Sequence, residues 1–273
     1  MPKIKANQIE LHYEIYGESQ PLVLISGLGY TLWQWHRMVP LLAEHFRVIT
    51  FDNRGVGESD KPVGPYSAQL LAADTAGLLD VLGIEKAVVM GHSMGGFIAQ
   101  ALALGFPHKL EKLILSSTNF GGPRHAPATP EAMKILTDIS IDAVTRFKNG
   151  LTVSTAPGWT EKNPDMVEAW TKWRMANPID PAAYQAQLAI GLSLYPEAAA
   201  FEGRLSNVKV PTLILAGEHD QVVPPENASL LAEKIPDSQV VILPDAGHFF
   251  PIETPEAASQ ALIDFVQGGD AKE

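Results

Sequence analysis

The segment Lys86-Ala87-Val88-Val89-Met90-Gly91-His92-Ser93-Met94-Gly95-Gly96 decides the fold, because it joins a strand pattern to a helix pattern through a sharp turn. Residues 86–90 are almost entirely apolar, as in a strand buried on both faces, and residues 94–104 predict a buried helix. Residues 91–95 form the pattern G-x-S-x-G, in which glycines relieve crowding around a strained serine. The hydroxyl of Ser93 is therefore expected to stand clear of the sheet at the positive end of a helix. The alternative is an ordinary glycine-rich turn with Ser93 as a helix cap.

The alternation of strands and helices continues over most of the 273 residues. Short apolar or alternating runs predict six more strands, at 9–16, 22–26, 47–51, 110–116, 210–216 and 239–243. A helix is expected over 67–82, with Ser67 as N-cap and Gly83 just past its end. The last helix is expected to begin with Thr254 as a cap, followed by Pro255 at its first position. This order predicts an α/β fold in which helices flank a mostly parallel central sheet.

The alternation lapses over residues 119–205, which contain Trp159, Trp170 and Trp173. Helical patterns at 165–175 and 182–194 predict a helical insertion, since a structureless loop of that length is improbable in a compact domain. The expected organisation is a core domain of residues 1–118 and 206–273 with a helical cap of residues 119–205. We interpret the insertion as a cap over an active site, and the alternative is a subdomain that only adds core.

A serine nucleophile needs a base, and the base needs an acid that orients it. His248 fits the base, because it lies on a turn-rich loop after the strand that ends at Leu243, at the sheet edge that carries the serine. His219 also follows a strand and is the alternative base. His92 belongs to the turn itself and is expected to point away from Ser93 in a structural role.

Asp220 is the favoured acid, because it directly follows a predicted strand and leaves room for one helix and one strand before His248. Glu218 and Asp245 are the alternatives. The chain order Ser93, Asp220, His248 is the order of the triad in α/β-hydrolases.

Four motifs make the chain similar to the α/β-hydrolase fold superfamily over essentially its whole length outside the insertion. They are the serine turn at 91–96, Asp52-Asn53-Arg54-Gly55-Val56-Gly57-Glu58-Ser59, Gly217-Glu218-His219-Asp220 and Gly247-His248. The chain most resembles the cofactor-free carboxylesterases and lactonases, including 3-oxoadipate enol-lactonase-like and acyl-homoserine-lactone-degrading proteins. The resemblance implies that the insertion is a mobile cap that shapes the substrate pocket.

The resemblance also implies an oxyanion hole made of two backbone N–H groups. One belongs to Met94, directly after the serine. The other belongs to Leu28 in Ser26-Gly27-Leu28-Gly29, where the superfamily usually has histidine in place of Ser26. Trp33 and Phe249 are expected to contact substrate, with core packing as the alternative.

Composition limits the other classes of function. The chain has 20 Lys and Arg against 31 Asp and Glu, a formal net charge of −11, which argues against nucleic acid as a partner. The absence of cysteine excludes thiolate metal sites and a cysteine nucleophile. Histidine and carboxylate residues lack metal-ligand spacing, so neither a metal nor a cofactor is expected. No apolar run approaches the ~20 residues of a membrane span and no signal-peptide pattern is visible, so a cytoplasmic protein without membrane contact is expected.

These features together predict a serine hydrolase that transfers the acyl group of a small-molecule ester or lactone to water through an acyl-enzyme. The same triad serves C–C bond hydrolases and cofactor-free perhydrolases, and a slow-turnover ligand receptor is a further alternative. Dehalogenases and epoxide hydrolases are disfavoured, because they carry aspartate where this chain has Ser93. The sequence makes no prediction of oligomeric state.

Overall fold

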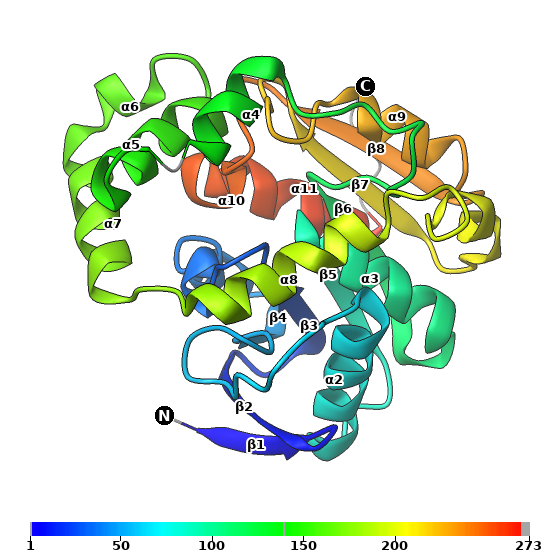
Figure 1. The fold of residues 1–273 in the computed structure, drawn as a ribbon. Coiled ribbons are helices and arrows are strands. Elements are labelled where there is room, and N and C mark those ends of the chain that lie inside the picture. The colour runs from blue at the N-terminus through cyan, green and yellow to red at the C-terminus, as the bar shows by residue number, and fades with distance from the viewer. Residues whose placement is uncertain (1, 139, 269–273) are drawn as a thin grey trace.

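The computed structural model describes residues 2–138 and 140–268, which form a central sheet with the strand order β1-β2-β4-β3-β5-β6-β7-β8 (Figure 1). β1 and β2 run antiparallel to their neighbours, whereas the pairs from β4 to β8 are parallel. The strands are β1 (Lys3–Ala6), β2 (Ile9–Tyr16), β3 (Gln20–Ile25), β4 (Phe46–Phe51), β5 (Ala87–His92), β6 (Leu110–Ser116), β7 (Thr212–Gly217) and β8 (Ser238–Leu243). Every predicted strand is confirmed within about two residues. β1 escaped prediction because its four residues are too few to show a period.

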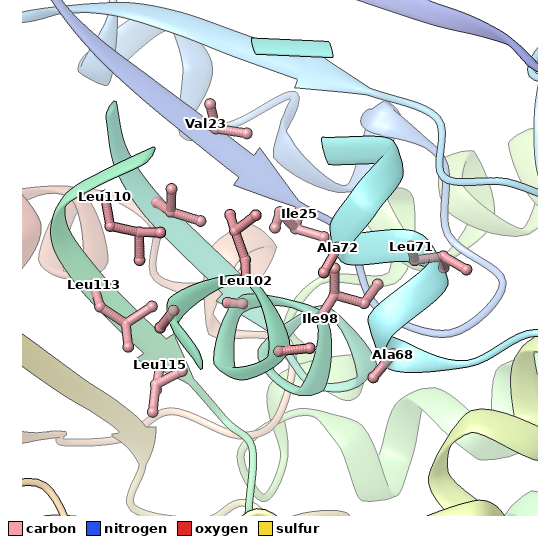
Figure 2. Close-up of a cluster of buried hydrophobic side chains, with 14 of the residues drawn as sticks. Val23, Ile25, Ala68, Leu71, Ala72, Ile98, Leu102, Leu110, Leu113 and Leu115 are labelled. Carbon is pink, nitrogen blue, oxygen red and sulfur yellow. The ribbon is translucent and has the colours of Figure 1, made fainter. Parts of the chain in front are cut away.

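Both faces of the sheet are covered by helices, which explains why its central strands are apolar throughout. Along β3, Val23 and Ile25 pack on one face, whereas Leu22 and Leu24 pack on the other, and all four side chains are fully buried. The first face is covered by α2 (Ala68–Val81), α3 (Met94–Gly105) and α9 (Glu226–Ala232), and Figure 2 shows the resulting cluster between α2, α3 and the strands. The second face is covered by α1 (Val39–Leu42), α10 (Phe250–Glu253) and α11 (Pro255–Gln267).

The chain between β6 and β7 is helical, as the lapse of strand patterns predicts. Figure 1 shows α5, α6 and α7 gathered beside the sheet, with α8 crossing in front of its middle. The helices of this segment are α4 (Pro130–Thr137), α5 (Ala143–Ser154), α6 (Trp159–Lys162), α7 (Pro164–Ala176), α8 (Pro181–Ser193) and the 3₁₀ turn η3 (Glu202–Asn207). Two further 3₁₀ turns, η1 (Leu32–Trp35) and η2 (Pro107–Lys109), lie outside this segment. The assignment of residues 119–205 as a cap stays a prediction.

Local capping signals explain the ends of α2 but not the start of α11. The Ser67 hydroxyl accepts a hydrogen bond from the Leu70 N–H, and Gly83 follows the helix with a left-handed φ of 68°, as predicted. The expected cap by Thr254 is wrong, because its hydroxyl is buried and makes no hydrogen bond within the described residues. The ψ of Thr254 is 57° rather than extended, since α10 runs almost directly into α11.

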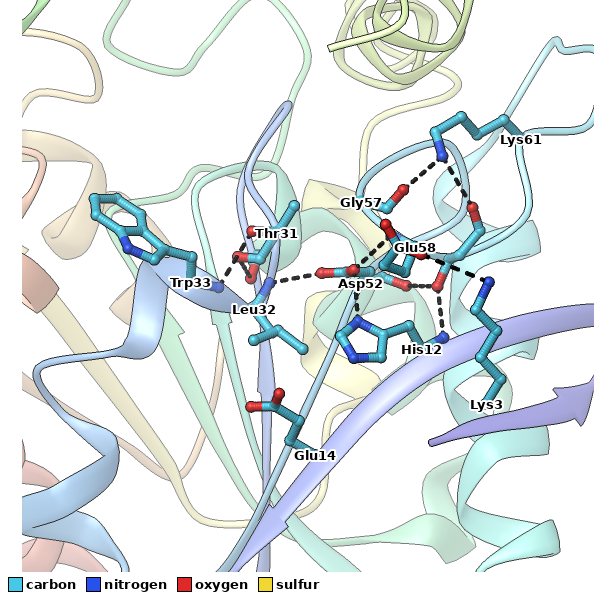
Figure 3. A network of polar contacts seen from close by, with 12 residues as sticks. Lys3, His12, Glu14, Thr31, Leu32, Trp33, Asp52, Gly57, Glu58 and Lys61 are labelled. Atoms are coloured by element: carbon cyan, nitrogen blue, oxygen red, sulfur yellow. Dashed lines mark hydrogen bonds and ion pairs between the residues drawn. The ribbon is translucent and has the colours of Figure 1, made fainter. Parts of the chain in front are cut away.

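The motif at 52–59 forms a network of hydrogen bonds at the carboxyl end of β4. Figure 3 shows the Asp52 carboxylate at the centre of this network, where it accepts hydrogen bonds from the Leu32 N–H, the Glu58 N–H and the His12 ring, each 2.9 Å long. The next side chain, Asn53, donates to the Ser26 carbonyl at 3.0 Å. The network therefore fixes the loop that follows β3 to the loop that follows β4.

Arg54 ties the same loop to α2 through a buried, bidentate ion pair with Asp74. Its Nε and Nη2 atoms lie 2.7 and 2.6 Å from the two carboxylate oxygens, and Asn7 donates a further hydrogen bond to Asp74 at 2.7 Å. The exposed fractions of the two side chains are only 8% and 2%. Loss of either partner would therefore leave a buried charge without a counter-ion.

Replacing Asp74 with asparagine is expected to lower the free energy of unfolding by about 3–5 kcal/mol, measured by urea denaturation. The exposed pair of Lys148 and Glu168, with its charged atoms 3.2 Å apart, provides the control, and Glu168→Gln is expected to cost less than ~1 kcal/mol. Equal costs for the two substitutions would contradict the structural role given to the Arg54 pair.

Candidate active site

Ser93 occupies the turn between β5 and α3 in a strained backbone conformation, with φ 55° and ψ −118°. The flanking glycines are required, because a Cβ on Gly91 would lie 2.2 Å from the Gly95 carbonyl oxygen and one on Gly95 would lie 2.2 Å from the Ile25 carbonyl oxygen. The Ser93 side chain does not cap α3. The structure thus favours a strained serine with a free hydroxyl over the alternative, in which Ser93 caps the helix of an ordinary glycine-rich turn.

His248 and Asp220 form a buried hydrogen-bonded pair. His248 Nδ1 lies 2.8 Å from Asp220 Oδ2, and the two residues are 5% and 3% exposed. The other carboxylate oxygen of Asp220 accepts the N–H groups of Val222 and Val223 at 2.9 and 2.8 Å. Both oxygens of Asp220 are therefore held, so the imidazole of His248 faces a carboxylate of fixed orientation.

The pair lies beside the serine turn but is not hydrogen-bonded to Ser93 within the described residues. The ring of His92, which precedes Ser93, lies 4.9 Å from the ring of His248, centroid to centroid. Hydrogen bonds between a nucleophile and its base are often long in the free enzyme and shorten when substrate binds. The three predicted triad residues are thus brought to one region, with one of their two hydrogen bonds formed.

His92 points into the core rather than toward the exposed edge of the turn. Its Nδ1 lies 2.8 Å from the Ser116 hydroxyl, and its Nε2 is buried without a partner in the described part of the chain. Burial lowers the pKa of His92 well below its ordinary value of 6.5, and the nearby His248 acts in the same direction. A neutral, core-packed imidazole agrees with the structural role predicted for His92.

The turn after β3 leaves one backbone donor free next to the serine. The Gly27 N–H donates to Gln34 Oε1 at 2.8 Å and the Gly29 N–H donates to Gln187 Oε1 at 2.9 Å, whereas the Leu28 N–H has no acceptor among the described residues. A Cβ on Gly27 would lie 3.3 Å from the Ser93 Cβ, so this turn lies directly against the serine.

Met94 offers the second predicted donor, because it is the first residue of α3 and its N–H has no acceptor within the helix. The two N–H groups that the resemblance names thus have no acceptor within the described residues. Their role as an oxyanion hole stays a prediction.

The alternative acid and base residues form a cluster of their own on the loops that follow β7 and β8, where Glu218 and Asp245 are exposed and His219 is half-buried. His219 Nε2 lies 3.8 Å from Glu218 Oε2, and the ligand atoms of these two residues and of Asp245 lie within 4.8 Å of one another. Two surface hollows of about 370 and 500 Å³ adjoin His219, and Ser93 lines neither of them. The structure thus pairs His248 with Asp220 and not with Glu218 or Asp245.

Trp33 and Phe249 pack between the core and the inserted helices. Trp33 stacks on Trp173 of α7 with ring centroids 4.0 Å apart, and Phe249 lies in a buried cluster with Trp170 of α7 and Leu151 of α5. Both side chains therefore make packing contacts, which were the alternative to substrate contact in the sequence analysis. Contact with substrate stays a prediction for each.

Glu253, which the sequence does not single out, joins the loop of His248 to the end of α5. Its two carboxylate oxygens accept the N–H of Gly247, at 2.8 Å, and the N–H of Ala156, at 2.5 Å. The Phe249 N–H also donates to the Ser154 carbonyl at 2.7 Å. The segment after α5 and the loop of His248 are therefore fixed to each other.

Burial raises the pKa of Glu253 above its ordinary value of 4.5, and Asp220 adds to the effect, although the two N–H donors and His219 oppose it. A raised folded-state pKa means that the folded protein holds the proton more tightly than the unfolded chain. The stability from this group is therefore full below pH ~4.5 and is lost as the pH rises through the folded-state pKa.

We expect the free energy of unfolding of the wild type, minus that of Glu253→Gln, to fall as the pH rises from about 4.5 toward neutrality. Urea denaturation at several pH values measures the difference. Glu256→Gln, at an exposed carboxylate on α11, is the matched control and is expected to show a smaller change. A difference that grows with pH would contradict the raised pKa.

A family model described as alpha/beta hydrolase fold matches residues 20–255. The chain therefore belongs to the α/β-hydrolase fold family, and at the level of that superfamily it is a hydrolase. Within the described residues, no helix is long and apolar enough to cross a membrane.

Several relatives cover nearly the whole chain. "Putative carbamate hydrolase RutD" of Azorhizobium caulinodans is 30% identical over 97% of this chain and 98% of its own. The enol-lactonase of Burkholderia xenovorans LB400 is 30% identical with a TM-score of 0.81, covering 97% of this chain and all of its own. A thermophilic esterase of Thermogutta terrifontis is 30% identical with a TM-score of 0.80, covering 98% of each chain.

Proposed function

We propose that the chain hydrolyses carboxylic esters or lactones through an acyl-enzyme on Ser93. The observation that carries the proposal is the buried pair of His248 and Asp220, 2.8 Å apart, beside the turn that holds Ser93 in its strained conformation. A carboxylate can only accept, so it selects the tautomer with the proton on Nδ1 and leaves Nε2 free to take the serine proton.

In this mechanism, Ser93 Oγ attacks the substrate carbonyl carbon while its proton passes to His248 Nε2. The N–H groups of Leu28 and Met94 bind the oxyanion of the tetrahedral intermediate, each contributing ~3 kcal/mol to lowering the barrier. When the intermediate collapses, the leaving oxygen takes the proton from His248, which opens the ring of a lactone or releases the alcohol of an ester. Water then attacks the acyl-enzyme with His248 as base, and the acid and free Ser93 are released.

The relatives support the choice of substrate class through the chemistry that their names share. An enol-lactonase, an esterase and a carbamate hydrolase all act at a carbonyl carbon that bears a heteroatom leaving group. A serine nucleophile, a base and an oxyanion hole provide what that reaction needs. Two of these three relatives act on an ester or a lactone by their names, so we take ester and lactone as the class and include a carbamate in the test.

A substrate panel tests the proposal. It contains p-nitrophenyl esters of increasing acyl length, γ-lactones, acyl-homoserine lactones, an aryl carbamate, a vinylogous diketone for C–C cleavage, and an acid with peroxide for perhydrolysis. We expect the highest kcat/KM on an ester or lactone, with repeated turnover. A preference for the carbamate, the diketone or peroxide would overturn the assignment, as would a single slow turnover of every compound.

A further inference from the structure

Two side chains of the inserted helices reach the turn that carries the Leu28 N–H. Arg174 of α7 donates from Nη1 to the Gly29 carbonyl at 3.0 Å, and Gln187 of α8 accepts the Gly29 N–H at 2.9 Å. Both side chains are buried, with exposed fractions of 9% and 0%. One residue of the turn is thus held at its N–H and at its carbonyl by two different helices.

The turn itself spans residues 27–30 and is closed by a hydrogen bond from the Tyr30 N–H to the Gly27 carbonyl, 3.2 Å long. Gly29 has a φ of 70°, the left-handed value that a type II turn requires at its third position. Each of the three peptide groups within the turn makes a hydrogen bond through its N–H or its carbonyl. The first of them is bonded only at the Gly27 carbonyl, so its N–H, which belongs to Leu28, has no acceptor in the described residues. The partners therefore fix the turn without using the donor that the proposed mechanism assigns to the oxyanion.

These bonds form a continuous path from Arg174 to Leu28. The guanidinium donates to the Gly29 carbonyl, and the N–H of the same peptide group belongs to Tyr30, which donates to the Gly27 carbonyl. The Gly27 carbonyl shares its peptide group with the Leu28 N–H. Hydrogen bonds in such a chain polarise one another, so a cation at one end strengthens the donor at the other, by about 10–30% per bond.

We propose that Arg174 and Gln187 are positioning residues for hydrolysis, which hold the turn at 27–30 and strengthen the Leu28 N–H as an oxyanion donor. The proposal rests on the function proposed above. It gives the inserted helices a part in the reaction itself, because two hydrogen bonds of the turn come from side chains of α7 and α8.

The surroundings of Arg174 agree with a role in binding the turn rather than a role in an ion pair. No carboxylate lies within 4.0 Å of its guanidinium among the described residues, and the group lies instead over the rings of Tyr30 and Trp173, at 4.6 and 5.3 Å. The aromatic faces stabilise the buried cation without neutralising its charge. The charge therefore remains available to polarise the Gly29 carbonyl.

Gln187 also links the turn to the core, because its amide donates to the Arg54 carbonyl at 2.8 Å. Its oxygen and nitrogen are thus both engaged with backbone groups of loops that follow β3 and β4. This orientation of the amide places its oxygen toward the Gly29 N–H, which prevents the middle peptide of the turn from flipping.

The test compares Arg174→Gln and Gln187→Met with the wild type on the best ester or lactone of the panel. We expect each variant to lower kcat about 10- to 100-fold with little change in KM, because weakening a donor costs less than the 10²–10³-fold typical of removing one. Inhibition by a trifluoromethyl ketone, whose adduct with Ser93 carries an oxyanion, is expected to weaken in parallel with kcat. A merely structural role would not link these two quantities.

Two matched variants serve as controls. Arg146→Gln removes another cation of the inserted helices, and Gln185→Met changes an exposed glutamine of α8. The hydrogen bonds from side chains to Gly29 in the described residues come from Arg174 and Gln187 and not from either of these two residues. Both are expected to keep kcat within about twofold of the wild type, since substitutions at surface positions away from the site usually have small effects. Thermal unfolding of all variants shows whether each one folds.

Three results would overturn the proposal. They are an unchanged kcat in both variants, a rise in KM alone, which would make Arg174 a substrate-binding residue, and a fall in kcat without weaker inhibition by the ketone. If one variant does not fold, the other decides. An inactive wild type would overturn the proposed function together with this inference, whereas an active wild type with unaffected variants would overturn this inference alone.

Discussion

Replacing Ser93 with alanine is expected to reduce kcat on esters and lactones by a factor on the order of 10⁵–10⁶, because the variant has no nucleophile. The fold should be unaffected, since the Ser93 hydroxyl makes no hydrogen bond within the described residues and does not cap α3. Alanine keeps the Cβ that the strained backbone already accommodates. Steady-state kinetics on the best panel substrate, together with thermal unfolding, measures both effects.

Ser117, which directly follows the neighbouring strand β6, offers a matched control. It also has a positive φ, of 41°, and its buried hydroxyl has no partner in the described part of the chain. Ser117→Ala therefore repeats the chemical change at another serine with a positive φ, and it is expected to leave kcat within about threefold of the wild type. Turnover by Ser93→Ala at a rate near that of the wild type would contradict the acyl-enzyme on Ser93.

The serine turn could be predicted from the sequence because its causes are local. A strand that feeds directly into a helix leaves no room for a Cβ at Gly91 or Gly95, so the glycines mark the close approach of backbone groups. Asp220 and His248 were predictable for a related reason, since each follows a strand that ends at the same edge of a parallel sheet. Strand order brings them together, and the choices between His248 and His219 and among the neighbouring carboxylates needed the structure.

The contacts around the site could not be predicted, because they join segments that are distant in sequence and carry no local pattern. Gln187 lies 158 residues from Gly29, and Arg174 lies 145 residues from it. On their own helices both look like ordinary polar positions. Whether a glutamine or arginine turns inward depends on how α7 and α8 pack on the core, which a period of apolar residues does not determine.

The failure of the Thr254 cap has a different cause. Thr-Pro before an apolar helix is a good capping pattern, but α10 ends at Glu253 and imposes its own backbone direction on Thr254. That short helix is held by Glu253, whose carboxylate binds the loop of His248 and the segment after α5. Tertiary contacts at the site therefore override a local signal in the adjacent helix.

Asp220→Asn is the second substitution with a very large expected effect, a fall in kcat of about 10⁴ at neutral pH. The reason lies in the two N–H groups of Val222 and Val223, which both donate to one oxygen of Asp220. In the variant, the amide oxygen must take that position, and the NH₂ group then faces His248 Nδ1. The imidazole is forced to carry its proton on Nε2, so it cannot accept the proton of Ser93.

Asp245→Asn and Glu218→Gln are the matched controls, because these carboxylates were the alternatives in the sequence and are exposed on the same loops. Both are expected to keep kcat within about threefold of the wild type, since neither touches His248. KM should change little in Asp220→Asn, because the substitution alters a tautomer and not the substrate pocket. A large loss of kcat in Asp245→Asn or Glu218→Gln, or near-normal turnover by Asp220→Asn, would assign the acid to another residue and contradict the pairing with His248.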